Sequence, residues 1–164
     1  MMNKMETTEK AQVITAAELL EHWQGHRNLT RKLIVAFPEK EFFDFSIGGM
    51  RPFAEMVLEL LAIAAPAIRE IATGKPEVFN EHPDHGKSKD NILQWWDKAT
   101  EEINDHWKGI PTSRFHETIK TFGQWDGTVQ SSIFYFMDNE IHHRGQGYVY
   151  LRALGIEPPL FWER

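Results

Sequence analysis

Four stretches of the chain carry apolar side chains at every third or fourth position, which is the spacing of one face of an α-helix. Local signals mark where these helices begin and end. Thr15 and Glu18 have the spacing of a capping box, Ser88 can cap a helix, and Pro38 ends one. The pattern predicts helices over residues 15–37, 50–72, 88–108 and 129–154.

The connections between these helices are long. Residues 39–49 are expected to form a polar and aromatic connector, and residues 75–87, which contain two prolines, a surface loop. Residues 112–127 break the helical period, and both a short extended excursion and an ordered loop are compatible with them. Loops of about a dozen residues exceed what simple antiparallel neighbours need, so we expect a long crossover connection.

Composition places these helices in one domain. The chain has 164 residues, of which 41% are hydrophobic, and it contains 6 Trp, 3 Tyr and 11 Phe, which is typical of a packed globular protein. The predicted fold class is therefore all-α, a four-helix bundle that occupies residues 1–164. Residues 1–12 are polar and are expected to be a flexible lead-in.

Charge and residue usage exclude several classes of function. The net charge of −6 gives no long-range attraction for a phosphate backbone, so nucleic acid is not an expected partner. The absence of cysteine excludes disulfides, thiolate metal sites and cysteine nucleophiles. No signal peptide and no apolar run of membrane-spanning length is found, which predicts a soluble cytoplasmic protein without a membrane partner.

The fourth predicted helix carries the residues most suggestive of chemistry. Asn139 and His143 are four residues apart, and so are Asp138 and His142, so the two side chains of each pair point the same way. Such a pair can share one metal ion or one polar ligand. Asn139 and His143 continue an apolar stripe and are expected to face inward, whereas Asp138 and His142 are expected to form a solvated or interfacial pair.

Several motifs resemble the DinB family, the damage-inducible, YfiT-like metal-binding bundles, which are unrelated to the DNA polymerase of the same name. They are HHRGQ at 142–146, YVYLR at 148–152, GIEPP at 155–159 and MRPFAEMVLE at 50–59. The resemblance implies a bundle that is commonly homodimeric and holds a divalent metal with three histidines. One histidine lies on the second helix and two lie in a His-x-x-x-His pair on the fourth. Characterised relatives include transferases and isomerases that use low-molecular-weight thiols.

The resemblance assigns metal ligands to Glu59, Asn139 and His143, so one of the three family histidines is kept. Three histidines suit zinc or nickel, whereas an amide oxygen is a weak donor for late transition metals. Two outcomes remain open, a metal site of altered preference or a metal-free polar pocket. The apolar neighbours of Glu59 imply that its carboxylate, if buried, requires a metal, a cation or a proton.

Two functions follow from these alternatives. One is a metal-dependent thiol S-transferase or hydrolase that acts on a small molecule. The other is a degenerate, metal-free homodimer with a binding or structural role. On the first helix, His26 lies on the apolar stripe beside His22 and is a candidate general base. Arg144 is expected to form a helical pair with Glu140 or to tie the fourth helix to a neighbour through a buried carboxylate.

Overall fold

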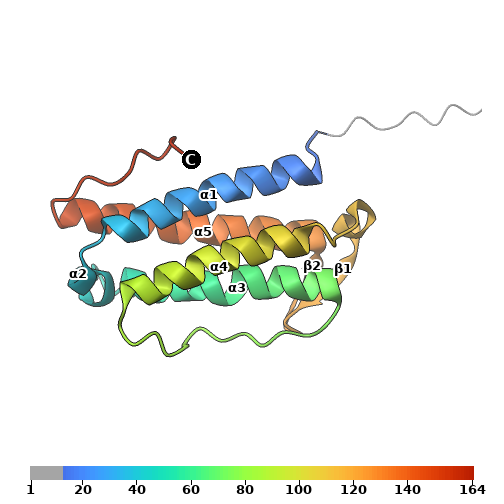
Figure 1. Ribbon diagram of the computed structural model, residues 1–164, viewed down its shortest axis with the longest axis horizontal. Coiled ribbons are helices and arrows are strands. Elements are labelled where there is room, and N and C mark those ends of the chain that lie inside the picture. The colour runs from blue at the N-terminus through green and yellow to red at the C-terminus, as the bar shows by residue number, and fades with distance from the viewer. Residues whose placement is uncertain (1–12) are drawn as a thin grey trace, which may run out of the picture.

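Four long helices lie side by side in the computed structural model, which describes residues 13–164 (Figure 1). The predicted four-helix bundle is confirmed, and its boundaries agree with the predicted ranges to within a few residues. The predicted lead-in, residues 1–12, lies outside the described residues. The long helices are α1 (Ala16–Ala36), α3 (Phe53–Thr73), α4 (Lys89–Trp107) and α5 (Val129–Ala153).

Local capping explains why the helices begin where they do. The Thr15 hydroxyl accepts a hydrogen bond from the backbone N–H of Glu18 at 3.1 Å, and the Glu18 carboxylate accepts from the backbone N–H of Thr15 at 2.7 Å. Ser88 caps α4 and Thr128 caps α5 in the same manner. Helix α3 begins three residues later than predicted, because Pro52 is extended (ψ 152°) and disfavours helical geometry in the residue before it.

A short helix, α2 (Glu39–Asp44), lies within the predicted polar and aromatic connector 39–49, where the sequence pattern predicted no helix. Its Phe42 is fully buried and packs edge-on against Phe37 and Phe53 at ring-centroid distances of 5.9 and 6.0 Å. A helix of six residues is too short to show a repeating apolar pattern, so only its packing reveals it.

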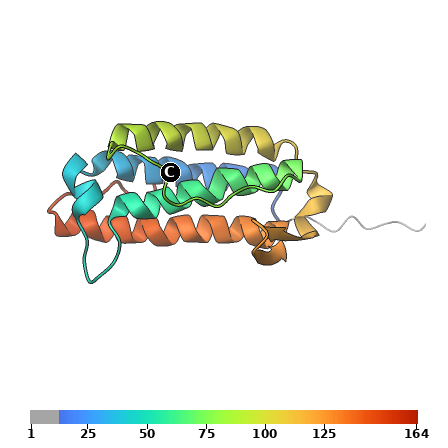
Figure 2. The same ribbon diagram turned by 90° about the horizontal axis from the view of Figure 1, so that it is seen from below.

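The chain crosses over once along the length of the bundle. Helices α1 and α3 each pack against both α4 and α5 (Figure 2). Helices α3 and α4 run in the same direction, so the segment 74–88 returns along the whole bundle between them (Figure 1). This connection confirms the predicted crossover, and it places Phe79 and Glu81 near the first turns of α5.

Residues 112–128 add a small hairpin to the end of the bundle. A 3-10 turn, Thr112–His116, leads into β1 (Thr118–Thr121) and β2 (Trp125–Thr128), which pair antiparallel. Phe122 and Gly123 take positive φ values of 51° and 65° in the turn between them. Of the two alternatives for this stretch, the extended one is correct. Within residues 13–164, no helix is long and apolar enough to cross a membrane.

Candidate functional site

The structure brings Glu59, Asn139 and His143 together across the contact between α3 and α5. The Asn139 side-chain amide donates a hydrogen bond to Oε1 of Glu59 at 3.0 Å. The same oxygen lies 3.2 Å from Nε2 of His143. Asp138 and His142 are exposed and are not part of this cluster.

Arg51 is the cationic partner of the partly buried Glu59 carboxylate. It precedes α3, and its guanidinium pairs with Oε2 of Glu59. Burial raises the pKa of Glu59, but the hydrogen bonds from Arg51 and Asn139 and the contact with His143 outweigh it and hold the pKa below its usual value. The apolar neighbours of Glu59 in the sequence predicted that its carboxylate, if buried, requires a metal, a cation or a proton, and they did not identify Arg51. Arg51 lies before the first residue of α3 and therefore shares no helical spacing with Glu59.

The second nitrogen of His143 is also held by the protein. Nδ1 lies 2.8 Å from Oε1 of Gln146, three residues later on the same helix, and the Gln146 amide nitrogen lies 3.4 Å from the Met50 sulfur. A histidine whose two ring nitrogens both have polar partners is fixed in orientation. The polar atoms of this cluster are therefore largely satisfied by one another.

The donor set decides whether these residues fit a divalent metal ion. A catalytic zinc ion is held by three strong protein ligands, and here only Glu59 and His143 are strong donors. The Asn139 amide nitrogen donates to the Glu59 carboxylate, which leaves only the weak amide oxygen as a third donor, and Arg51 pairs with the same carboxylate. Within residues 13–164, no three side chains of His, Cys, Asp or Glu gather to hold a metal ion. Glu59, Asn139 and His143 thus offer two strong donors and one weak one, where a zinc or nickel site has three strong protein ligands.

A cavity of about 370 Å³ lies beside this cluster, and Glu59 belongs to both. Its wall comes from α3, the crossover segment, the hairpin and the first turns of α5. The aromatic residues of the wall are Phe79, Phe122, Trp125, Tyr135 and Phe136. Its carboxylates are Glu59, Glu81 and Asp126. The size and the mostly apolar wall with a few polar groups are those of a small-molecule site.

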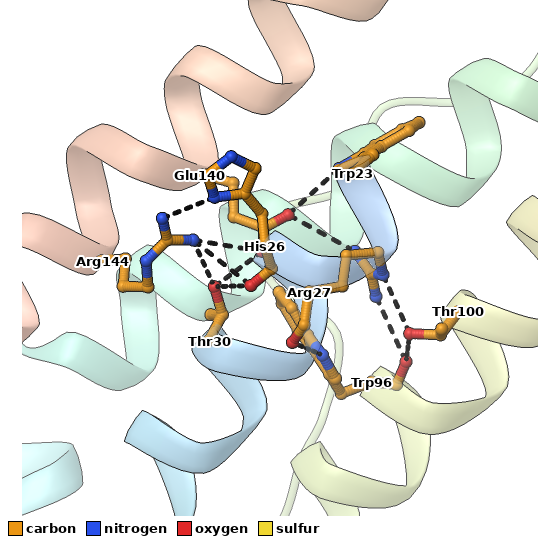
Figure 3. Close-up of polar contacts among 8 residues, drawn as sticks. All are labelled: Trp23, His26, Arg27, Thr30, Trp96, Thr100, Glu140 and Arg144. Carbon is orange, nitrogen blue, oxygen red and sulfur yellow. Dashed lines mark hydrogen bonds and ion pairs between the residues drawn. The ribbon is translucent and has the colours of Figure 1, made fainter. Parts of the chain in front are cut away.

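His26 is not brought to this cluster; it belongs to a buried polar network between α1, α4 and α5 (Figure 3). Arg144 donates to Nδ1 of His26 at 2.8 Å and to the His26 carbonyl at 3.3 Å. On the other side of the ring, Nε2 lies 3.1 Å from both Nε2 of His22 and Nη1 of Arg164. Arg144 thus ties α5 to α1.

Glu140 is the carboxylate at the centre of this network, with 1% of its surface exposed. It accepts hydrogen bonds from the Thr30 hydroxyl at 2.6 Å and the Trp23 indole at 3.2 Å (Figure 3). The guanidinium groups of Arg27 and Arg144 lie 3.9 and 3.8 Å away. Sequence spacing identified the Glu140 and Arg144 pair but missed Arg27, which lies on another helix.

Arg27 links α1 to α4 within the same network. It donates to the Thr100 hydroxyl at 2.8 Å and to the Trp96 carbonyl at 3.2 Å, and its guanidinium stacks 4.1 Å from the centre of the Trp96 ring (Figure 3). Burial lowers the pKa of Arg27 to about 10, while Glu140 opposes that shift. Arg27 therefore remains charged at neutral pH, and the network is one of structural ion pairs.

The position of His26 in this network predicts that its titration makes the stability of the fold depend on pH. Burial, and then the charges of Arg144, Arg164 and His22, lower its pKa from 6.5 to about 4. Between these two values the unfolded chain binds a proton that the folded chain does not, so His26 lowers stability as the pH falls through this window. Its contribution has a slope of at most about 1.4 kcal/mol per pH unit.

We expect His26→Gln to remove this slope, because the glutamine oxygen still accepts from Arg144 but does not titrate. Urea unfolding of the protein and of the His26→Gln variant between pH 7 and pH 4.5 measures the difference. Parallel stability curves for the two proteins would show that His26 titrates normally in the fold.

Comparison with known proteins agrees with this architecture. A crystal structure of a DinB-like protein from Bacillus cereus superposes with a TM-score of 0.72 at 17% identity, covering 88% of this chain and 95% of that one. A DinB-like protein from Bacillus subtilis gives a TM-score of 0.67 at 18% identity, covering 89% and 99%. No curated protein matches the chain. The sequence profile of the DinB family matches residues 1–163, and the chain therefore belongs to the DinB family.

Proposed function

We propose that this protein binds a small organic molecule in the cavity beside Glu59, with the polar cluster of Arg51, Glu59, Asn139 and His143 in place of the family's metal ion. The observation that carries the proposal is the position of Glu59, whose carboxylate is held by the cluster and whose side chain lines the cavity. A ligand in the cavity would therefore meet an oriented, charged group in a mostly aromatic wall.

The segments that form the wall support a binding role. Helices α3 and α5 contribute Glu59 and Tyr135, whereas the crossover segment contributes Phe79 and the hairpin contributes Trp125. The crossover segment and the hairpin lie outside the four long helices, and both contribute residues to the wall of this cavity. Trp125 and Tyr135 remain 51% and 58% exposed, which leaves large aromatic surfaces available to a ligand.

Titration with the neutral fluorophore N-phenyl-1-naphthylamine tests this proposal, because its emission rises when it enters an apolar cavity. We expect saturable binding with one probe per chain. Ser132→Trp fills the cavity from α5 and should abolish binding, whereas Asp138→Trp, at an exposed position of the same helix, should leave it intact. Equal binding by both variants would place the probe elsewhere and overturn the proposal.

A metal-dependent thiol transferase or hydrolase is the second candidate. The observation that favours it is the 3.2 Å between Nε2 of His143 and Oε1 of Glu59. Two ligand atoms that are each about 2.1 Å from one ion lie roughly 3.0–3.4 Å apart at octahedral or tetrahedral angles. The charge of Arg51 beside Glu59 and the weak third donor make us place this candidate second.

Metal titration separates the two candidates. We expect the protein to take up no stoichiometric zinc or nickel, and the double variant Glu59→His/Asn139→His to bind one ion per chain, because it restores three imidazole ligands. Isothermal titration calorimetry and elemental analysis after gel filtration measure both. Stoichiometric metal in the unmodified protein that is lost in His143→Ala would replace the first candidate with the second.

Two further expectations from the family stay predictions. Homodimer formation is measured by light scattering coupled to gel filtration. Use of a low-molecular-weight thiol is measured by its consumption in the presence of an electrophile, with and without added zinc or nickel.

A further inference from the structure

We infer that the ligand of this cavity is an organic cation, a protonated amine attached to an apolar or aromatic body. The inference rests on the proposed binding function and adds the charge of the ligand to it. Three independent features of the wall carry it: the sign of its charged groups, the nature of its apolar groups, and a buried hydroxyl without a partner.

All charged side chains in the wall are acidic. Within residues 13–164, Glu59, Glu81 and Asp126 line the cavity, and no lysine, arginine or histidine does. Arg51 pairs with Glu59 from outside the wall, and the exposed Lys120 lies 3.7 Å from Asp126. The walls therefore carry more negative than positive charge, which attracts a cation and repels a carboxylate or phosphate.

The apolar part of the wall is aromatic. Phe79, Phe122 and Trp125 contact one another at ring-centroid distances of 5.6–6.1 Å, and Trp125 meets the other two rings edge-on. Tyr135 and Phe136 complete the aromatic wall from α5. The faces of aromatic rings are electron-rich and attract cations, with tryptophan the strongest of them. An aliphatic wall of equal area has no electron-rich faces and would not favour a cation over a neutral ligand of the same size.

Thr121 supplies a polar atom that the protein leaves unused. It lines the cavity at the end of β1 and is 4% exposed, and its hydroxyl has no hydrogen-bond partner among the described residues. An unsatisfied buried hydroxyl is unfavourable unless a ligand or water completes it. The N–H of an ammonium group could donate to the Thr121 oxygen in a cavity whose apolar wall is mostly aromatic.

Three probes of equal size and different charge test the inference. They are 3-phenylpropylamine, 3-phenylpropan-1-ol and 3-phenylpropanoate, which are cationic, neutral and anionic at pH 7. Isothermal titration calorimetry at low ionic strength should give at least about tenfold tighter binding for the amine than for the alcohol, and the weakest binding for the carboxylate. Added salt should reduce the preference for the amine.

Glu81→Gln isolates the charge of the wall, and Glu101→Gln, at an exposed position of α4, is the matched control. Glu81→Gln should weaken amine binding about threefold or more and leave alcohol binding unchanged, whereas Glu101→Gln should alter neither. Equal binding of amine and alcohol, or tighter binding of the carboxylate, would overturn the cation inference and leave the binding function standing. Failure of all three probes, together with N-phenyl-1-naphthylamine, would overturn both.

Discussion

Replacement of Glu140 by alanine is expected to lower the free energy of unfolding by about 3–5 kcal/mol. Glu140 is buried between the guanidinium groups of Arg27 and Arg144 and accepts hydrogen bonds from Thr30 and Trp23. Removal of one member of a buried ion-pair network leaves the remaining charges without compensation in an apolar environment. The large effect therefore arises from the two arginines, which stay buried, more than from the lost contacts.

Two control substitutions separate the effect of losing the Glu140 charge from the effect of losing its hydrogen bonds. Glu140→Gln keeps an oxygen that can accept from Thr30 or Trp23 and should be destabilised less than Glu140→Ala. Glu101→Ala, at an exposed position, should change stability by no more than about 0.5 kcal/mol. Urea unfolding followed by circular dichroism measures all three. If Glu140→Ala were as stable as Glu101→Ala, the network would contribute nothing to the fold.

Replacement of Gly147 by alanine is expected to lower the free energy of unfolding by about 1–2 kcal/mol, although alanine favours a helix. At Gly147, α5 passes close to both α1 and α3. A Cβ atom there would lie 2.6 Å from Cε2 of Phe53 and 2.8 Å from Cδ2 of Leu33, both fully buried. Helix α5 would have to move away from α1 and α3, or the side chains of Phe53 and Leu33 would have to leave their rotamers.

Gly145 is the matched control, two residues earlier on the same helix. A Cβ atom at Gly145 would meet no atom within 4 Å, so Gly145→Ala should raise stability by up to about 1 kcal/mol through helix propensity alone. Opposite signs for the two substitutions, measured by urea or thermal unfolding, are the expected result. A stabilising Gly147→Ala would show that the packing between α5 and its neighbours is loose.

The bundle and most helix boundaries were predictable because their determinants are local. The capping box at Thr15 and Glu18, the Ser88 cap and the apolar stripes of the helices act within a few residues of the chain. The predictions failed where a local signal was too short or was overridden. Helix α2 has only six residues, and Pro52 delays the start of α3.

The candidate site was predictable in part. The spacing of Asn139 and His143 and the family motifs pointed to residues that the structure brings together with Glu59. The same reasoning did not identify Arg51 as the partner of Glu59 or Arg27 as the partner of Glu140. Arg27 meets Glu140 from another helix, and Arg51 lies before the first residue of the helix that carries Glu59, so no helical spacing connects either pair.

The sequence by itself therefore determined the four long helices, the family and the inward face of α5, all of which depend on short-range patterns or on motifs. Only the tertiary structure decided what surrounds that face. The cavity forms where the crossover segment at Phe79 and the hairpin at Trp125 meet α3 and α5. Its acidic and aromatic character arises from residues far apart in the chain, and contacts between such residues depend on how the elements pack rather than on any periodic pattern.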